Sequence, residues 1–131
     1  MIGRRVFLPL LVSFLFARTV RAADKKKGGG LSYIQIDPLT ATILRGDGRR
    51  GVLTVEVGVD VPGNGALHAR ADASQPRLRA AYLQVLQAYA SGLGPGVPPD
   101  ADYIARQLQQ ETNRVLGQPG ARLLLGTILA N

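Results

Sequence analysis

Apolar and polar residues alternate without interruption through the segment Leu53–Val61. The apolar residues occupy every second position: Leu53, Val55, Val57, Val59 and Val61. Successive side chains of a strand point to opposite faces, so these five groups share one face that another element must cover. The segment is therefore predicted to be a half-buried strand, and the Pro-Gly-Asn-Gly sequence that follows it predicts its end.

Two β-favouring runs, Leu31–Ile36 and Leu39–Leu44, precede this strand and are separated by Asp37 and Pro38. Proline has no backbone N–H to donate, so Pro38 indicates an edge position, a bulge or the start of a strand. The glycine-rich segment Arg45–Gly51 then predicts a hairpin loop, and we interpret its Arg-Gly-Asp tripeptide as a turn.

After residue 75 the apolar residues recur with the period of an α-helix instead of at every second position. In Pro76–Ser91 one stripe collects the apolar residues Leu78, Tyr82, Val85, Leu86 and Tyr89. An alanine-rich piece, Ala66–Ser74, predicts an earlier helical segment that joins this helix through a kink at Gln75-Pro76. His68 lies in that piece among charged and alanine neighbours, and we expect it to face solvent.

A second helix is predicted after the glycine- and proline-rich loop Gly92–Pro99. Asp100 is its expected N-cap, the helix runs to about Leu116, and Gly117 fits its C-terminal stop. Its apolar stripe consists of Ile104, Leu108, Val115 and Leu116.

The segment Arg122–Leu129 is almost continuously apolar, which predicts a strand buried on both faces and central in its sheet. Gly126 within it indicates a place where a neighbour packs closely. The elements follow one another as strand, strand, helix, helix, strand. We therefore expect residues 31–131 to form a small α+β domain, in which two helices pack on one face of an antiparallel or mixed sheet.

Residues 1–22 have the pattern of an export signal. The apolar run Val6–Ala17 would span roughly 18 Å as a helix, short of the roughly 30 Å hydrocarbon core of a membrane. The Val-Arg-Ala sequence at residues 20–22 fits a signal peptidase, so cleavage is expected after Ala22. The alternatives are an uncleaved anchor, which leaves the domain on the inner membrane facing the periplasm, and a misassigned start codon.

The start of this segment indicates an export route. Arg4-Arg5-Val6-Phe7-Leu8 matches the twin-arginine signature in Arg4, Arg5, Phe7 and Leu8, with general secretion as the alternative. Either route delivers the mature chain to the periplasm of a bacterium.

Residues 23–30 are rich in lysine and glycine and predict a flexible tether. Its three lysines, Lys25, Lys26 and Lys27, are expected to make at most weak contact with a membrane surface.

Net charge and composition exclude several functions. The formal charge is +7, but loss of residues 1–22 leaves 12 basic against 9 acidic residues, or +3, and residues 31–131 carry +1. The basic residues do not line one helix face between aromatic ones, so we expect no nucleic-acid partner.

The chain has no cysteine and one histidine, which excludes disulfides, thiol catalysis and sites with several histidine ligands. No carboxylate pairs with a nucleophile or base at a readable spacing, and neither Ser74 nor Thr127 has a histidine partner in the pattern. We therefore predict no catalytic, metal-binding or cofactor-binding residue, and no enzyme.

Several strings resemble the FliL family of flagellar basal-body-associated proteins. They are Tyr33–Leu39, the alternating strand, the helix Pro76–Leu86, and, at the end, Leu108–Asn113 followed by Leu123–Ile128. The resemblance implies a stomatin-like fold, no enzymatic activity, and protein partners at the inner membrane, with self-assembly as one option. Members of that family usually keep a transmembrane helix, which the run Val6–Ala17 is too short to form. A flagellar role and an adaptor role unrelated to motility both stay open.

Overall fold

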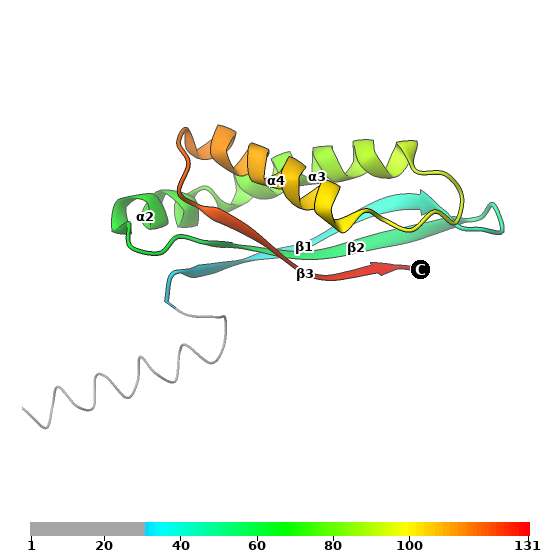
Figure 1. Cartoon of the computed structure of the whole chain (residues 1–131), viewed down its shortest axis with the longest axis horizontal. Helices are drawn as coiled ribbons and strands as arrows, with labels where there is room; N and C mark the ends of the chain where they lie inside the picture. Colours follow the sequence, from blue (N-terminus) through cyan, green and yellow to red (C-terminus); the bar gives the residue numbers. More distant parts are fainter. Residues whose placement is uncertain (1–30) are drawn as a thin grey trace, which may run out of the picture. The chain divides into compact units, whose positions relative to one another are not determined.

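A computed structural model describes residues 31–131, in which Ile34–Asn131 form one compact unit (Figure 1). The chain follows the order β1, β2, α2, α3, α4, β3. Their bounds are Tyr33–Leu44 for β1, Arg50–Asp60 for β2, Gly65–Ala73 for α2, Gln75–Gly92 for α3, Ala101–Leu116 for α4 and Arg122–Ala130 for β3.

The three strands form one antiparallel sheet in the order β1-β2-β3, so β2 is central and both other strands are edges. Helices α3 and α4 lie side by side on one face of this sheet (Figure 1). The predicted α+β architecture is therefore confirmed, and the antiparallel alternative is the correct one.

The core lies between the helices and the helix-facing side of the sheet. All five alternating apolar residues of the predicted strand Leu53–Val61 are buried, at 2% exposure or less. They meet the apolar stripe of α3, in which Leu78, Tyr82 and Leu86 are fully buried. The apolar face of β2 and the apolar stripe of α3 thus pack against each other in the core.

Strand β1 is continuous across the interruption seen in the sequence. Its buried residues switch register there, because Asp37 and Pro38 are exposed one after the other between the buried Ile36 and Leu39. Pro38 lies on an edge strand, where its missing N–H costs no ladder hydrogen bond within the sheet. The edge position inferred from this proline is confirmed.

Both predicted helices and the short piece before them are present. Asn64, which the sequence reasoning did not identify, caps α2 by accepting a hydrogen bond from the Leu67 N–H at 3.0 Å. Asp100 caps α4 as predicted, accepting from the Tyr103 N–H at 3.1 Å. Gly117 ends α4 with a φ of 79°, a left-handed conformation that glycine adopts without a Cβ clash.

The prediction that Arg122–Leu129 forms the central strand of the sheet is wrong. Strand β3 is an edge strand, and within it only Leu123 is buried. Within residues 31–131, helices cover one face of the sheet, so a strand of it has one face covered by the described elements. A strand that is apolar on both faces therefore leaves some of its side chains exposed.

A β-bulge lies in the middle of the β2–β3 pair, where the register shifts between Val55 and Val57. The close approach inferred for Gly126 is confirmed here, because a Cβ on this residue would lie 3.1 Å from the Cβ of Glu56. The Glu56 carboxylate also accepts a hydrogen bond from the Thr127 N–H at 3.3 Å. Glu56 therefore packs closely against Gly126 and forms a hydrogen bond with Thr127, the two residues of the bulge.

Candidate interaction surface

The residues assigned to export lie outside the described part of the chain. They are Arg4, Arg5, Phe7, Leu8 and the cleavage position after Ala22, together with the tether lysines Lys25, Lys26 and Lys27. Within residues 31–131, no helix combines the length and the apolar character that a membrane span needs.

His68 does not face solvent as expected. The side chain is half-buried, and its Nε2 atom is buried without a hydrogen-bond partner. The reason is that α2 contacts both α3 and α4, so the residue beside the buried Leu67 is partly covered. Leu67 and Ala69 flank His68, and with alanine at four positions of α2 the sequence shows no clear apolar stripe that would distinguish the covered face of this helix from the open one.

Acidic side chains in the described residues take part in local hydrogen bonds. Asp47 accepts from the side chain of Arg45 and from the backbone of Arg49 in the hairpin loop, at 3.1 and 3.0 Å. Glu111 pairs with Arg114 one turn later on α4, at 2.6 Å. Within residues 31–131, no group of three or more acidic or histidine side chains is placed to hold a metal ion.

The one buried pair of hydroxyl groups among the described hydrogen bonds joins α3 to α4. The Tyr82 hydroxyl lies 2.5 Å from the Thr112 Oγ1, which in turn donates to the Leu108 carbonyl at 2.8 Å. Thr112 has a single hydroxyl hydrogen and uses it on that carbonyl, so Tyr82 is the donor in the first bond. Burial raises the pKa of Tyr82.

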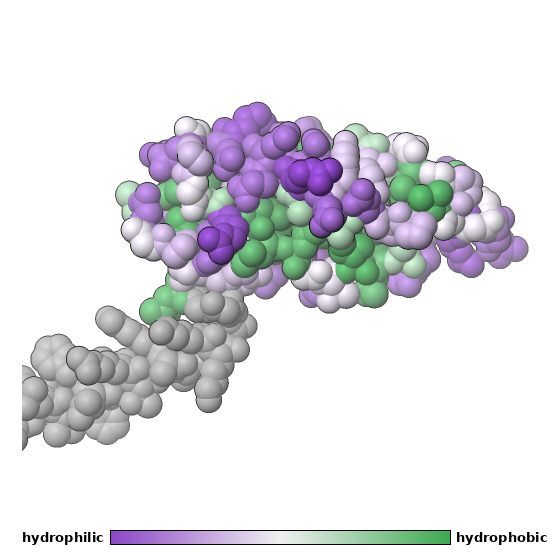
Figure 2. Space-filling model, viewed as in Figure 1, coloured by the Kyte–Doolittle hydropathy of each residue, from purple (hydrophilic) through white to green (hydrophobic). Residues whose placement is uncertain are grey.

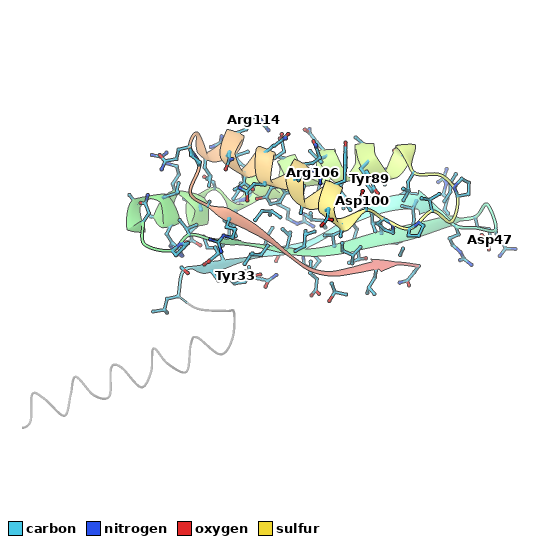
Figure 3. All side chains as sticks on the ribbon, viewed as in Figure 1. Tyr33, Asp47, Tyr89, Asp100, Arg106 and Arg114 are labelled. Carbon is cyan, nitrogen blue, oxygen red and sulfur yellow. The ribbon has the colours of Figure 1, made fainter. Side chains whose placement is uncertain are left out.

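A small apolar groove lies between α3 and α4. The rings of Tyr89 and Tyr103 stack across it with their centroids 5.3 Å apart, and the Tyr89 hydroxyl accepts from the Asp100 N–H at 2.7 Å (Figure 3). The groove encloses about 270 Å³ and is lined by Val85, Leu86, Ala88, Tyr89, Tyr103, Ile104 and Gln107. These contacts hold the end of α3 against the start of α4.

The outer face of the sheet, opposite the helices, also carries exposed apolar side chains. Four large apolar side chains are exposed on it: Leu44 at 44%, Val52 at 47%, Leu124 at 39% and Leu129 at 51%. At the β3 edge of the sheet, which this view faces, Figure 2 shows apolar residues along the strip that β3 follows in Figure 1, below the hydrophilic surface of α4. Exposed apolar groups that share one face are typical of a surface that binds another protein.

Sequence reasoning missed this surface, although the signal was present. Thr54, Glu56 and Asp60 occupy the alternate positions of the strand predicted most clearly, and their side chains must reach water. A strand paired with that one shares its open face. The apolar residues of β3 on the same side are therefore open as well.

No protein-family model, curated protein or solved structure matches this chain.

Proposed function

We propose that the chain is an exported, non-enzymatic assembly domain that acts in the periplasm beside an inner-membrane complex. The resemblance of residues 31–131 to the FliL family supports this role and suggests the flagellar motor as the complex. The observation that carries the proposal is the outer face of the sheet, which no element of residues 31–131 covers and which has four exposed apolar side chains. Such a face offers area for protein contact, whereas the acidic side chains named above serve the local structure.

A second candidate is a small exported adaptor that is unrelated to motility. The length of the run Val6–Ala17 favours it, because a run of roughly 18 Å does not supply the membrane anchor that the family usually keeps. Both candidates require export, so export is tested first.

The export test compares two pairs of conservative substitutions in the full chain. Arg4→Lys/Arg5→Lys changes the twin-arginine pair, and Arg49→Lys/Arg50→Lys is a matched control in the exposed hairpin region. We expect the control to reach the periplasm and the first variant to stay in the cytoplasm, as seen by fractionation and antibody detection. N-terminal sequencing of the exported chain is expected to begin at Ala23.

The possible outcomes test the export route and the periplasmic location separately. Export of the Arg4→Lys/Arg5→Lys variant would refute the twin-arginine route and favour general secretion, with the periplasmic location intact. Retention of the unaltered chain in the cytoplasm would refute the proposed function itself. A membrane-bound chain that still carries residues 1–22 would establish the anchored alternative.

Deletion of the gene separates the two candidates. A flagellar accessory role predicts a smaller swimming zone in soft agar, restored when the unaltered chain is supplied from a plasmid. Normal swimming, or a host without flagellar genes, would favour the adaptor.

A further inference from the structure

The two edge strands of the sheet, β1 and β3, differ in how far side chains of the helices bind their backbone hydrogen-bonding groups. On β1, the Arg79 guanidinium donates to the Pro38 carbonyl at 2.9 Å, and the Gln87 side chain accepts from the Thr42 N–H at 3.1 Å. Side chains of α3 thus occupy hydrogen-bonding groups of this strand, and a proline interrupts it. Both devices protect an edge strand from pairing with another chain.

The other edge is capped only at its beginning. Gln109 of α4 donates to the Ala121 carbonyl and accepts from the Leu123 N–H, both at 2.8 Å. Among the described residues, nothing comparable covers β3 from Leu125 to Ala130, which pairs with β2 alone. This section contains neither proline nor a charged side chain.

Register shows which backbone groups point outward. Val52 and Asn131 exchange two backbone hydrogen bonds, at 2.9 and 3.0 Å. Hydrogen-bonded and non-bonded pairs alternate along an antiparallel ladder, so Ile128, three positions back, directs its N–H and C=O away from β2. Beyond the bulge, the Leu123 N–H points outward to the Gln109 side chain, and Leu125, two positions on, points the same way.

We propose that the free edge of β3 pairs with β3 of a second copy of this chain, antiparallel and around a two-fold axis. In the register we infer, Leu125 lies opposite Ile128 of the second copy, and the two residues exchange backbone hydrogen bonds. Leu124 then lies opposite Leu129 of the second copy on the outer face. The three-strand sheets of the two copies become one six-strand sheet.

Self-complementarity favours a second copy over an unrelated strand. The outward-pointing residues of each strand are separated by the same two bulge residues, Gly126 and Thr127, so both strands match when they run in opposite directions. Both faces of the pair are apolar, with leucine against leucine on one side and leucine against isoleucine on the other. Arg122, which is the one charged residue of β3, lies outside the paired section, so like charges do not meet.

The proposed pairing gives β3, which is almost continuously apolar, a second strand neighbour, whereas within the described residues it has β2 alone. A pair of short strand sections buries less than the roughly 1,600 Å² of a standard interface. We therefore expect a reversible dimer with a dissociation constant of roughly micromolar or weaker.

Sedimentation velocity of the chain as isolated from cells tests the pairing over a range of concentrations. We expect a monomer–dimer equilibrium, and Leu129→Lys is expected to raise the dissociation constant about tenfold or more, because it places a charge in both symmetry-related contacts. Val52→Lys is the matched control, since Val52 is similarly exposed on the same face of the sheet but lies on the central strand. Circular dichroism and a urea midpoint check that both variants fold.

Disulfide trapping tests the register, and the absence of cysteine from the chain gives it a clean background. Leu124→Cys and Leu129→Cys are prepared separately. The proposed register places residue 124 opposite residue 129 of the other copy in a non-hydrogen-bonded pair, where side chains lie close. A disulfide-linked dimer is therefore expected in the mixture of the two variants and not in either one alone.

A single monomeric species at several hundred micromolar would overturn the inference. A dimer that Val52→Lys abolishes and Leu129→Lys spares would also overturn it, because two sheets would then stack face to face. Equal cross-linking of Leu129→Cys with itself would refute the register. None of these measurements depends on export or motility, so the self-pairing and the proposed function succeed or fail separately.

Discussion

The buried hydroxyl pair of α3 and α4 allows a quantitative test of the helix packing. Tyr82 and Thr112 are both fully buried, and the geometry makes Tyr82 the donor and Thr112 the acceptor. The two ends of this bond are therefore not equivalent. Tyr82→Phe removes the donor and leaves Thr112 still donating to the Leu108 carbonyl, whereas Thr112→Val leaves the Tyr82 hydroxyl buried without an acceptor.

The free energy of unfolding is expected to reflect this asymmetry. Loss of one hydrogen bond in Tyr82→Phe costs about 1 kcal/mol, and an unsatisfied buried hydroxyl in Thr112→Val costs about 1–3 kcal/mol. The double variant carries no orphaned hydroxyl, so it is expected to be no less stable than Thr112→Val alone. In a domain of this size, 1 kcal/mol corresponds to a shift of roughly 4–8 °C in Tm.

Urea denaturation followed by circular dichroism measures all four members of the cycle. Tyr103→Phe is the matched control, because its ring lies at the surface and the change is expected to stay within about 0.5 kcal/mol. Equal costs for the two single variants, with an additive double variant, would refute the assignment of donor and acceptor.

Two further predictions concern pH and the end of the sheet. Burial raises the pKa of Tyr82 above its ordinary 10.0, so the folded chain holds the phenolic proton more tightly than the unfolded chain. The contribution of this group to the free energy of unfolding is therefore fully present below about pH 10 and is lost as the pH rises further. Urea midpoints measured from about pH 8 to about pH 11 are expected to decline less steeply in Tyr82→Phe than in the unaltered chain. At the end of the sheet, a Cβ in Gly51→Ala would overlap the carbonyl oxygen of Asn131, so a loss of about 1–3 kcal/mol is expected. Gly65→Ala is the control, since nothing lies within 4 Å of its Cβ, and equal thermal midpoints for the two variants would contradict the packing.

Local signals in the sequence identified most of the elements. The hairpin loop, the helix caps Asp100 and Gly117 and the edge proline Pro38 each act through their own backbone or that of near neighbours. Such interactions span a few residues, so a short stretch of sequence contains both partners. The two periodicities, of strand and of helix, indicated the buried faces for the same reason.

Contacts between residues that are distant in the chain could not be predicted from the sequence. The partner of the Tyr82 hydroxyl is thirty positions away, and α2, which carries His68, contacts the two later helices α3 and α4. An apolar stripe indicates that a face is buried, but it does not indicate which polar atom lies opposite. The hydroxyl pair and the half-buried histidine therefore became visible only in the folded chain.

By itself, the sequence determined that β2 buries one face, that amphipathic helices cover it, and that β3 is strand-forming and apolar on both sides. The tertiary structure decided where β3 lies. Burial of both its faces needs cover on both sides of the sheet, and the helices of residues 31–131 cover one side. An apolar strand was thus placed at an open edge, because the number and length of the covering elements, rather than the strand's own residues, set how much of it is buried.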